Sequence, residues 1–192
     1  MFNYFFKNMN TLFLICALAF ISIANAQGVS AVDNKGTIKK ILIPTRTELF
    51  DTTGGFEITE DEIIIPFNIQ GIIDSNDYTT TINSITIKKP GTYKVTYRVT
   101  AQITSGGDGG EEFRSGAQYA LYKDGFSVPG SASATYHRKT ALSKDTANAS
   151  QILDLVADDE LTVRGNRYAG PSTISTVANG SSFLVERIKL EP

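Results

Sequence analysis

A segment near the middle of the chain, GTYKVTYRVTAQI from Gly91 to Ile103, alternates strictly between two kinds of side chain. Every second residue from Tyr93 is apolar or aromatic, and every residue in between is polar. This period of two is typical of a β-strand with one buried face, because successive side chains of a strand point to opposite sides. The residues that we expect to face the inside of the protein are Tyr93, Val95, Tyr97 and Val99.

Other segments rich in Ile, Val, Thr and Tyr are also typical of strands, and residues that favour turns separate them. Pro90-Gly91 marks a tight turn, and Asp124-Gly125 between two apolar runs predicts a hairpin. No segment shows sustained apolar spacing of 3.6 residues, as a helix would require. The sequence therefore predicts an all-β protein of about eight to ten short strands, arranged as an antiparallel sandwich or barrel.

The first 26 residues have the features of a secretory signal peptide. Lys7 precedes an apolar run from Leu12 to Ala24, and Ala24-Asn25-Ala26 is a small-x-small cleavage site. A retained membrane anchor is the alternative, but the run is shorter than the roughly 20 residues of a spanning helix. Acylation at Cys16 is disfavoured, because small residues are missing just before it. We predict cleavage between Ala26 and Gln27, export to the cell surface or the extracellular space, and no membrane insertion of the mature chain.

The rest of the chain is long enough for one domain with its own core. We interpret Gln27 to Thr37, which is polar and small, as a flexible leader, and residues 38–192 as the folded domain. Cys16 is the only cysteine, so disulfides cannot stabilise the mature protein. The formal charge of the full chain is −2, and loss of Lys7 makes the mature form −3. Without a basic excess, nucleic-acid binding is not expected.

Four segments, in order, carry a resemblance to a known family. Pro90-Gly91 is followed by Tyr93 and Tyr97, and a strand-and-turn segment follows at Ala120 to Gly125. The last two segments are Ser150 to Val163 and Ser181 to Ile188. The chain resembles the globular C1q domain of the C1q/tumour-necrosis-factor superfamily, and is most similar to bacterial members such as those at the tips of spore-surface filaments.

The resemblance covers about residues 38–190 and departs from the family pattern in two segments. Asp158 stands where glycine is usual, and the final segment lacks its glycine. The collagen stem of many members is also missing. The resemblance implies a ten-stranded jelly roll of two packed sheets, a tight non-covalent homotrimer, and a role in adhesion, structural assembly or protein binding rather than catalysis.

The polar side of the central segment has two interpretations. In trimers similar to this family, that face of the strand lies towards neighbouring subunits, which would make it a polar contact between chains. The alternative is a solvated sheet face. The residues concerned are Lys94, Thr96 and Arg98, and in the first interpretation Arg98 pairs with a carboxylate of the next chain.

A carbohydrate-binding module is the alternative function. Tyr168 in RGNRYAGPST could be an exposed aromatic that stacks on a sugar, with Arg167 beside it. Packing in the core or in an interface would explain Tyr168 as well. The partner would then be a glycan instead of a surface protein.

Neither a resident cofactor nor an active site is expected, although calcium deserves consideration. Asp108, Glu111 and Glu112 in a glycine-rich segment could supply the oxygen ligands that Ca²⁺ prefers, and the alternative set is Asp158, Asp159 and Glu160. His137, the only histidine, is expected on an exposed strand or loop. The acidic cluster from Glu60 to Glu62 could hold a glycosidase pair, but a solvated acidic loop is the simpler reading.

Overall fold

The structure, a computed structural model, describes residues 28–32, 35–36, 38–42, 44–105, 114–138 and 143–190. The chain divides into two compact units, Met1–Ile43 and Pro44–Pro192. The predicted signal peptide and its cleavage site lie outside the described residues, so both stay predictions. Among the residues that the structure does describe, no helix is long and apolar enough to cross a membrane.

In the first unit, strand β1 (Gly28–Val32) pairs antiparallel with β2 (Ile38–Leu42). Gly36 between them has a φ of 77°, a left-handed conformation that glycine adopts without strain and that reverses the chain. Backbone pairing therefore extends over Gly28–Val32, where the sequence predicted a flexible leader. The folded domain also begins at Pro44 rather than at residue 38.

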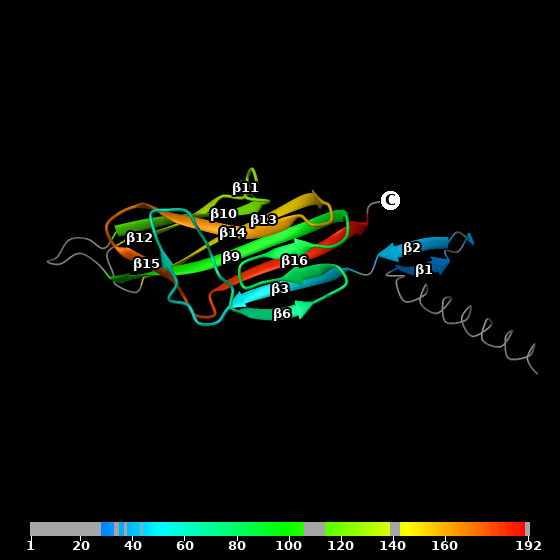
Figure 1. Cartoon of the computed structure of the whole chain (residues 1–192), viewed down its shortest axis with the longest axis horizontal. Helices are drawn as coiled ribbons and strands as arrows, with labels where there is room; N and C mark the ends of the chain where they lie inside the picture. The colour runs from blue at the N-terminus through cyan, green and yellow to red at the C-terminus, as the bar shows by residue number, and fades with distance from the viewer. Residues whose placement is uncertain are drawn as a thin grey trace, which may run out of the picture. The chain divides into compact units, whose positions relative to one another are not determined.

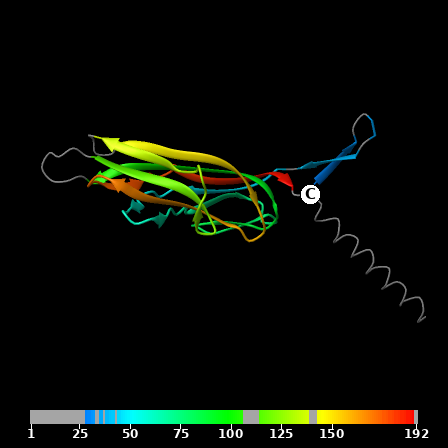
Figure 2. The same cartoon turned by 90° about the horizontal axis from the view of Figure 1, so that it is seen from above.

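In the described residues of the Pro44–Pro192 unit, the strands form two antiparallel sheets of seven strands each. The first, called the β9 sheet, has the order β4 (Glu57–Ile58), β15 (Thr173–Thr176), β9 (Gly91–Ser105), β16 (Ser181–Leu190), β3 (Thr45–Asp51) and β6 (Ile69–Ile73), with β13 (Lys144–Leu155) along the other edge of β9. The second, called the β10 sheet, has the order β11 (Phe126–Ser127), β10 (Arg114–Lys123), β14 (Glu160–Ala169), β8 (Ile85–Ile87) and β7 (Tyr78–Thr80), with β12 (Ser133–Arg138) on β10 and β5 (Ile63–Ile64) on β14. In both views the long strands of this unit run side by side (Figures 1 and 2).

The sequence prediction of an all-β, two-sheet sandwich is confirmed, although the strands are more numerous than ten. Several strands are pieces of two or three residues, such as β5, which ends shortly before Pro66. Proline has no N–H for a ladder bond, and the chain leaves the ladder before it. The predicted hairpin at Asp124-Gly125 is confirmed, with φ values of 50° and 82° at the two turn residues.

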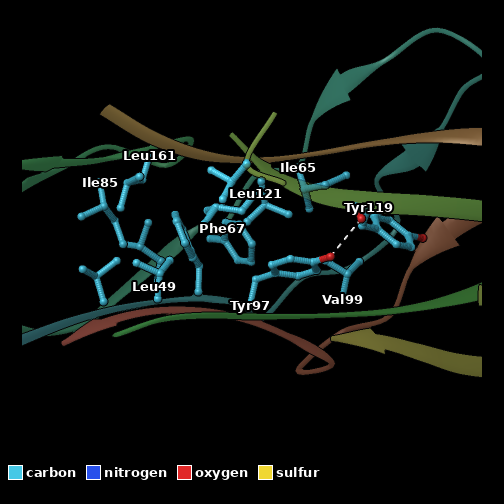
Figure 3. Close-up of a cluster of buried hydrophobic side chains, with 14 of the residues drawn as sticks. Leu49, Ile65, Phe67, Ile85, Tyr97, Val99, Tyr119, Leu121 and Leu161 are labelled. Atoms are coloured by element: carbon cyan, nitrogen blue, oxygen red, sulfur yellow. Dashed lines mark hydrogen bonds between the residues drawn. The ribbon is translucent and has the colours of Figure 1, made fainter. Parts of the chain in front are cut away.

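The central strand β9 has the two faces that its alternation predicts. Tyr93, Val95, Tyr97 and Val99 are all buried between the sheets. Figure 3 shows Tyr97 and Val99 pointing towards Leu121 on the other side of the core. Burial of such side chains contributes on the order of 1.5–3 kcal/mol each, so this strand is a main source of stability.

The Tyr97 hydroxyl is buried in this core and is hydrogen-bonded. Its single proton lies between two acceptors, the backbone carbonyl of Tyr119 at 2.9 Å, drawn as a dashed line in Figure 3, and that of Ser131 at 2.6 Å. Both acceptors belong to the side of the sandwich opposite β9. Tyr97 therefore joins the two layers by a ring contact and by hydrogen bonds.

A buried ionic cluster joins the sheets at another position. Arg187 of β16 is fully buried, and its guanidinium lies 2.7 Å from the Asp77 carboxylate, just before β7. Lys89 lies 2.9 Å from the other oxygen of Asp77, and the Thr45 hydroxyl donates to Asp77 at 2.5 Å. Burial alone would raise the pKa of Asp77, but the bonds from Thr45 and Lys89 and the charge of Arg187 together hold it below its usual value.

Candidate functional site

The outer face of the β9 sheet carries the residues that the sequence analysis assigned to an assembly surface. Lys94 and Arg98 are exposed, and Thr96 between them is half-buried. Within the described part of the chain, neither Lys94 nor Arg98 forms a salt bridge. Their charges are therefore available to a partner.

The cross-strand neighbours of these residues make the face mixed in character. Lys94 is opposite Glu186, which is in turn opposite Arg46, so opposite charges alternate across β9, β16 and β3. In the next row Thr96 bonds to the Ser150 hydroxyl at 3.0 Å on one side and is opposite Leu184 on the other. The face thus combines charge pairs, hydroxyl ladders and apolar side chains.

The outer face of the β10 sheet carries the predicted ligand-binding residues. Tyr168 is 50% exposed, and it lines an open hollow of about 260 Å³ together with Arg167 and Glu60. The Arg167 guanidinium lies 2.8 Å from the Glu60 carboxylate and donates to the carbonyl of Gly170 at 3.0 Å. Arg167 therefore supports the wall of the hollow, and the exposed ring beside it is that of Tyr168.

A second hollow, of about 130 Å³, lies further along β14. The Arg164 guanidinium is 4.6 Å from the centre of the Tyr122 ring and 3.2 Å from the Glu62 carboxylate. A hydrogen bond to that carboxylate raises the pKa of the Tyr122 hydroxyl. The expectation of a solvated acidic loop holds for Glu60 and Glu62, which are both exposed, and β5 brings this segment alongside β14, where each acid pairs with an arginine.

Several residues of this face escaped the sequence analysis. Tyr136 is 41% exposed and lies on the outer side of β12, while Gln118 and Asn166 form a hydrogen bond of 3.0 Å across β10 and β14. The alternation in Ser133–Arg138 was the available signal, since it places Tyr136 on the face opposite to Thr135 and His137. Nothing in the sequence indicated which strands would lie beside β12.

His137 is buried, with an exposed fraction of 1%, so the expectation of an exposed histidine is wrong. The reason is its place on β12, where His137 is opposite the buried Ser115 on the inner side of the sheet. Burial lowers the pKa of His137, while the Asp145 carboxylate and the backbone of Ser143 oppose this shift. The imidazole is therefore held neutral at ordinary pH.

This burial predicts a pH dependence of stability. The folded pKa of His137 lies below its usual value of 6.5, so the unfolded chain takes up the proton first as the pH falls. We expect the free energy of unfolding to decrease as the pH drops below about 6.5, measured by urea denaturation from about pH 7.5 to about pH 5.5. In His137→Gln this slope should become flatter. An unchanged slope would show that His137 does not titrate on unfolding.

The predicted calcium ligands Asp108, Glu111 and Glu112 lie outside the described residues, so that prediction is untested. Among the residues that are described, no group of three or more His, Cys, Asp or Glu is placed to hold a metal. Asp159 is instead paired with Lys123 at 2.7 Å and accepts the backbone N–H of Val156.

Comparison with known proteins supports the fold. No protein-family model matches the sequence, and no curated protein matches it. The crystal structure of murine APRIL at pH 8.5 is similar, with a TM-score of 0.52 at 10% identity over 76% of this chain and 100% of the APRIL chain. The structure of Eiger TNF from S. frugiperda gives 0.50 at 13% identity over 78% of this chain and 95% of that one. The protein therefore has a tumour-necrosis-factor-like jelly-roll fold.

Proposed function

We propose that the protein is an exported homotrimer that acts as a non-catalytic binding or adhesion module of the bacterial C1q-like type, at the cell surface or outside the cell. The observation that carries the proposal is the composition of the outer face of the β9 sheet. The tumour-necrosis-factor-like fold and the sequence resemblance agree with it. The ligand of the assembled module would be a surface protein or a glycan.

The outer face of the β9 sheet is suited to a contact between copies of the chain. In a ring of three, each interface joins two different surfaces, so a charge on this face needs a partner on another part of the next subunit. Arg98 and Lys94 supply such charges, and Leu184 supplies apolar area between them. An interfacial Arg98 must be fully hydrogen-bonded in the assembly, because a buried and unpaired charge is costly.

The arrangement of the titratable residues favours binding over catalysis. A Ser-His-Asp mechanism needs an imidazole that reaches a substrate, and His137 is enclosed by protein. A glycosidase needs two carboxyl groups at one bond, one of them protonated. Glu60 and Glu62 instead each pair with a different arginine, Arg167 and Arg164 respectively.

The oligomeric state tests this proposal. We expect light scattering on residues 27–192 to give three times the mass of one chain, and Arg98→Glu to reduce it to that of one chain. The charge reversal should leave the fold intact, because Arg98 is exposed and forms no salt bridge within the described chain. Circular dichroism dominated by β-structure in the variant would confirm this.

Arg138→Glu is the matched control. Arg138 is an exposed arginine of β12 on the other sheet, so its reversal should not change the mass. A wild-type protein that remains a single chain at high concentration would contradict the trimer. Equal dissociation of both variants would show a general effect of charge, not an interface at Arg98.

A further inference from the structure

We propose that the outer face of the β10 sheet binds a saccharide chain on a flat platform of two tyrosines and two amides. The platform comprises Tyr136, Gly116, Tyr168, Gln118 and Asn166, which β12, β10 and β14 place side by side. The platform lies on the β10 sheet, whereas Arg98 lies on the β9 sheet. Saccharide binding therefore does not depend on the proposed trimer.

Tyr168 is held in place by an irregularity of the sheet. Ala117 pairs with Arg167 and Gly116 pairs with Ala169, so Tyr168 is the extra residue of a β-bulge. Bulges re-aim side chains and are frequent beside binding sites. A Cβ at Gly116 would lie 2.6 Å from the Tyr168 ring, so the ring occupies the space that any other residue at position 116 would fill. The hydroxyl end of the ring lies over the Gly116 backbone, and the residue remains half exposed.

Tyr136 approaches the same glycine from the other side. It is the direct cross-strand partner of Gly116 on β12, so the two tyrosines flank one glycine on the outer face. The Arg138 guanidinium lies 5.3 Å from the centre of the Tyr136 ring and restricts the ring's movement. Two large aromatic side chains thus remain exposed and fixed over a surface that has no Cβ between them.

The amides provide the polar groups that an exposed aromatic pair alone lacks. Gln118 donates from Nε2 to Asn166 Oδ1 at 3.0 Å, and this bond fixes both side chains. Each amide has two N–H donors and an oxygen acceptor, so the Gln118 oxygen and the Asn166 nitrogen are left for a ligand. Together with the tyrosine hydroxyls, they present donors and acceptors along the edges of two apolar rings.

This combination of groups matches a pyranose ring better than other ligands. A sugar has apolar C–H groups on its faces and hydroxyls around its edge, so it can stack on tyrosine while it bonds to an amide. A hydrophobic peptide or a lipid would require a contiguous apolar patch, and the platform is interrupted by amides. The net negative charge disfavours a nucleic acid.

The length of the face indicates an oligosaccharide and not a single sugar. From Tyr168 the outer face of β14 continues through Asn166 to Arg164, a distance of about 13 Å at the rise of a strand. Arg164 and Tyr122 line the second hollow there, beside the first hollow at Tyr168 and Glu60. A chain of sugar units lying along β14 would contact both hollows and the amides between them.

The test uses residues 27–192, since Pro44–Pro192 has its own core, on a glycan array of neutral and acidic oligosaccharides, followed by titration calorimetry with the strongest hit. We expect binding that weakens at least tenfold in Tyr168→Ala and in Tyr136→Ala. Gly116→Ala should also weaken it, because the added methyl group displaces the Tyr168 ring without removing it. Tyr168→Phe should retain most of the affinity, since stacking does not need the hydroxyl.

Phe126→Ala is the matched control, because Phe126 is a 79% exposed aromatic that lines neither hollow. Its loss should leave binding unchanged. No binding to any glycan of the array, or equal binding by the wild type and both alanine variants, would overturn the proposal. Light scattering on the same variants separates the two ideas, since these substitutions should not alter the oligomeric state.

Discussion

Arg187→Ala is expected to destabilise the protein by about 3–5 kcal/mol, because it removes the fully buried cation that pairs with the Asp77 carboxylate and leaves Asp77 paired with the more exposed Lys89. Arg187 and Asp77 are both fully buried and come from opposite sheets. Loss of the guanidinium also leaves a cavity between the sheets. Urea denaturation followed by circular dichroism measures the change in the free energy of unfolding.

Two further variants serve as controls for Arg187→Ala. Arg46→Ala, an exposed arginine of β3, should change stability by less than about 0.5 kcal/mol. Replacing both partners, as in Asp77→Leu with Arg187→Met, should cost less than Arg187→Ala alone, because both fully buried charges are then gone and the partly exposed Lys89 can reach solvent. If the double variant is the less stable of the two, the cluster contributes favourable energy beyond the compensation of its own desolvation.

The same cluster predicts a loss of stability in acid. The folded pKa of Asp77 lies below its usual value of 3.8, so its contribution is fully present above that pH. It is lost as the pH falls from 3.8 through the folded pKa, because the native carboxylate must then be protonated. This loss should be smaller in Arg187→Ala, because the charge of Arg187 is one of the causes that lower the pKa of Asp77.

Tyr97→Ala should have a comparably large effect, about 3–5 kcal/mol, because it removes a buried aromatic ring from the middle of the core. Tyr97→Phe separates the ring from the hydroxyl. It should cost about 1–3 kcal/mol, since the carbonyls of Tyr119 and Ser131 lose a donor in a place that water does not reach. Thermal and urea denaturation of the two variants measure both effects.

Tyr136→Phe is the control for the hydroxyl, since the Tyr136 side chain is exposed and the change should cost less than about 0.5 kcal/mol. If Tyr97→Phe costs as little as this control, the two bonds of the Tyr97 hydroxyl do not hold the layers together. If it costs as much as Tyr97→Ala, the ring contributes little beyond its hydroxyl.

The features that followed from the sequence are those set by local alternation and turn chemistry. The inward side of β9, the hairpin at Asp124-Gly125 and the all-β class all depend on a few consecutive residues. Such signals indicate which side of a strand is buried. They do not identify the neighbouring strands, so the width of each sheet could not be predicted.

The contacts that could not be predicted from the sequence join segments far apart in the chain. Arg187 and Asp77 are 110 positions apart, and neither neighbourhood shows an unusual pattern. His137 stands between Tyr136 and Arg138, and this polar context suggested exposure, although alternation on β12 turns its ring inward. The sequence indicated Tyr168 as a candidate, but it did not indicate Tyr136. The two tyrosines share a surface because β10 lies between β12 and β14.

The position of the last strand has a consequence for how the polypeptide reaches its native state. β16, at residues 181–190, lies between β3 and β9 (Figure 1), so without it β3 and its neighbour β6 have no backbone pairing to β9. The ionic cluster also cannot form before β16, which carries Arg187, is in place. The layer can therefore close only after residue 190 has been synthesised, and such distant pairings slow folding.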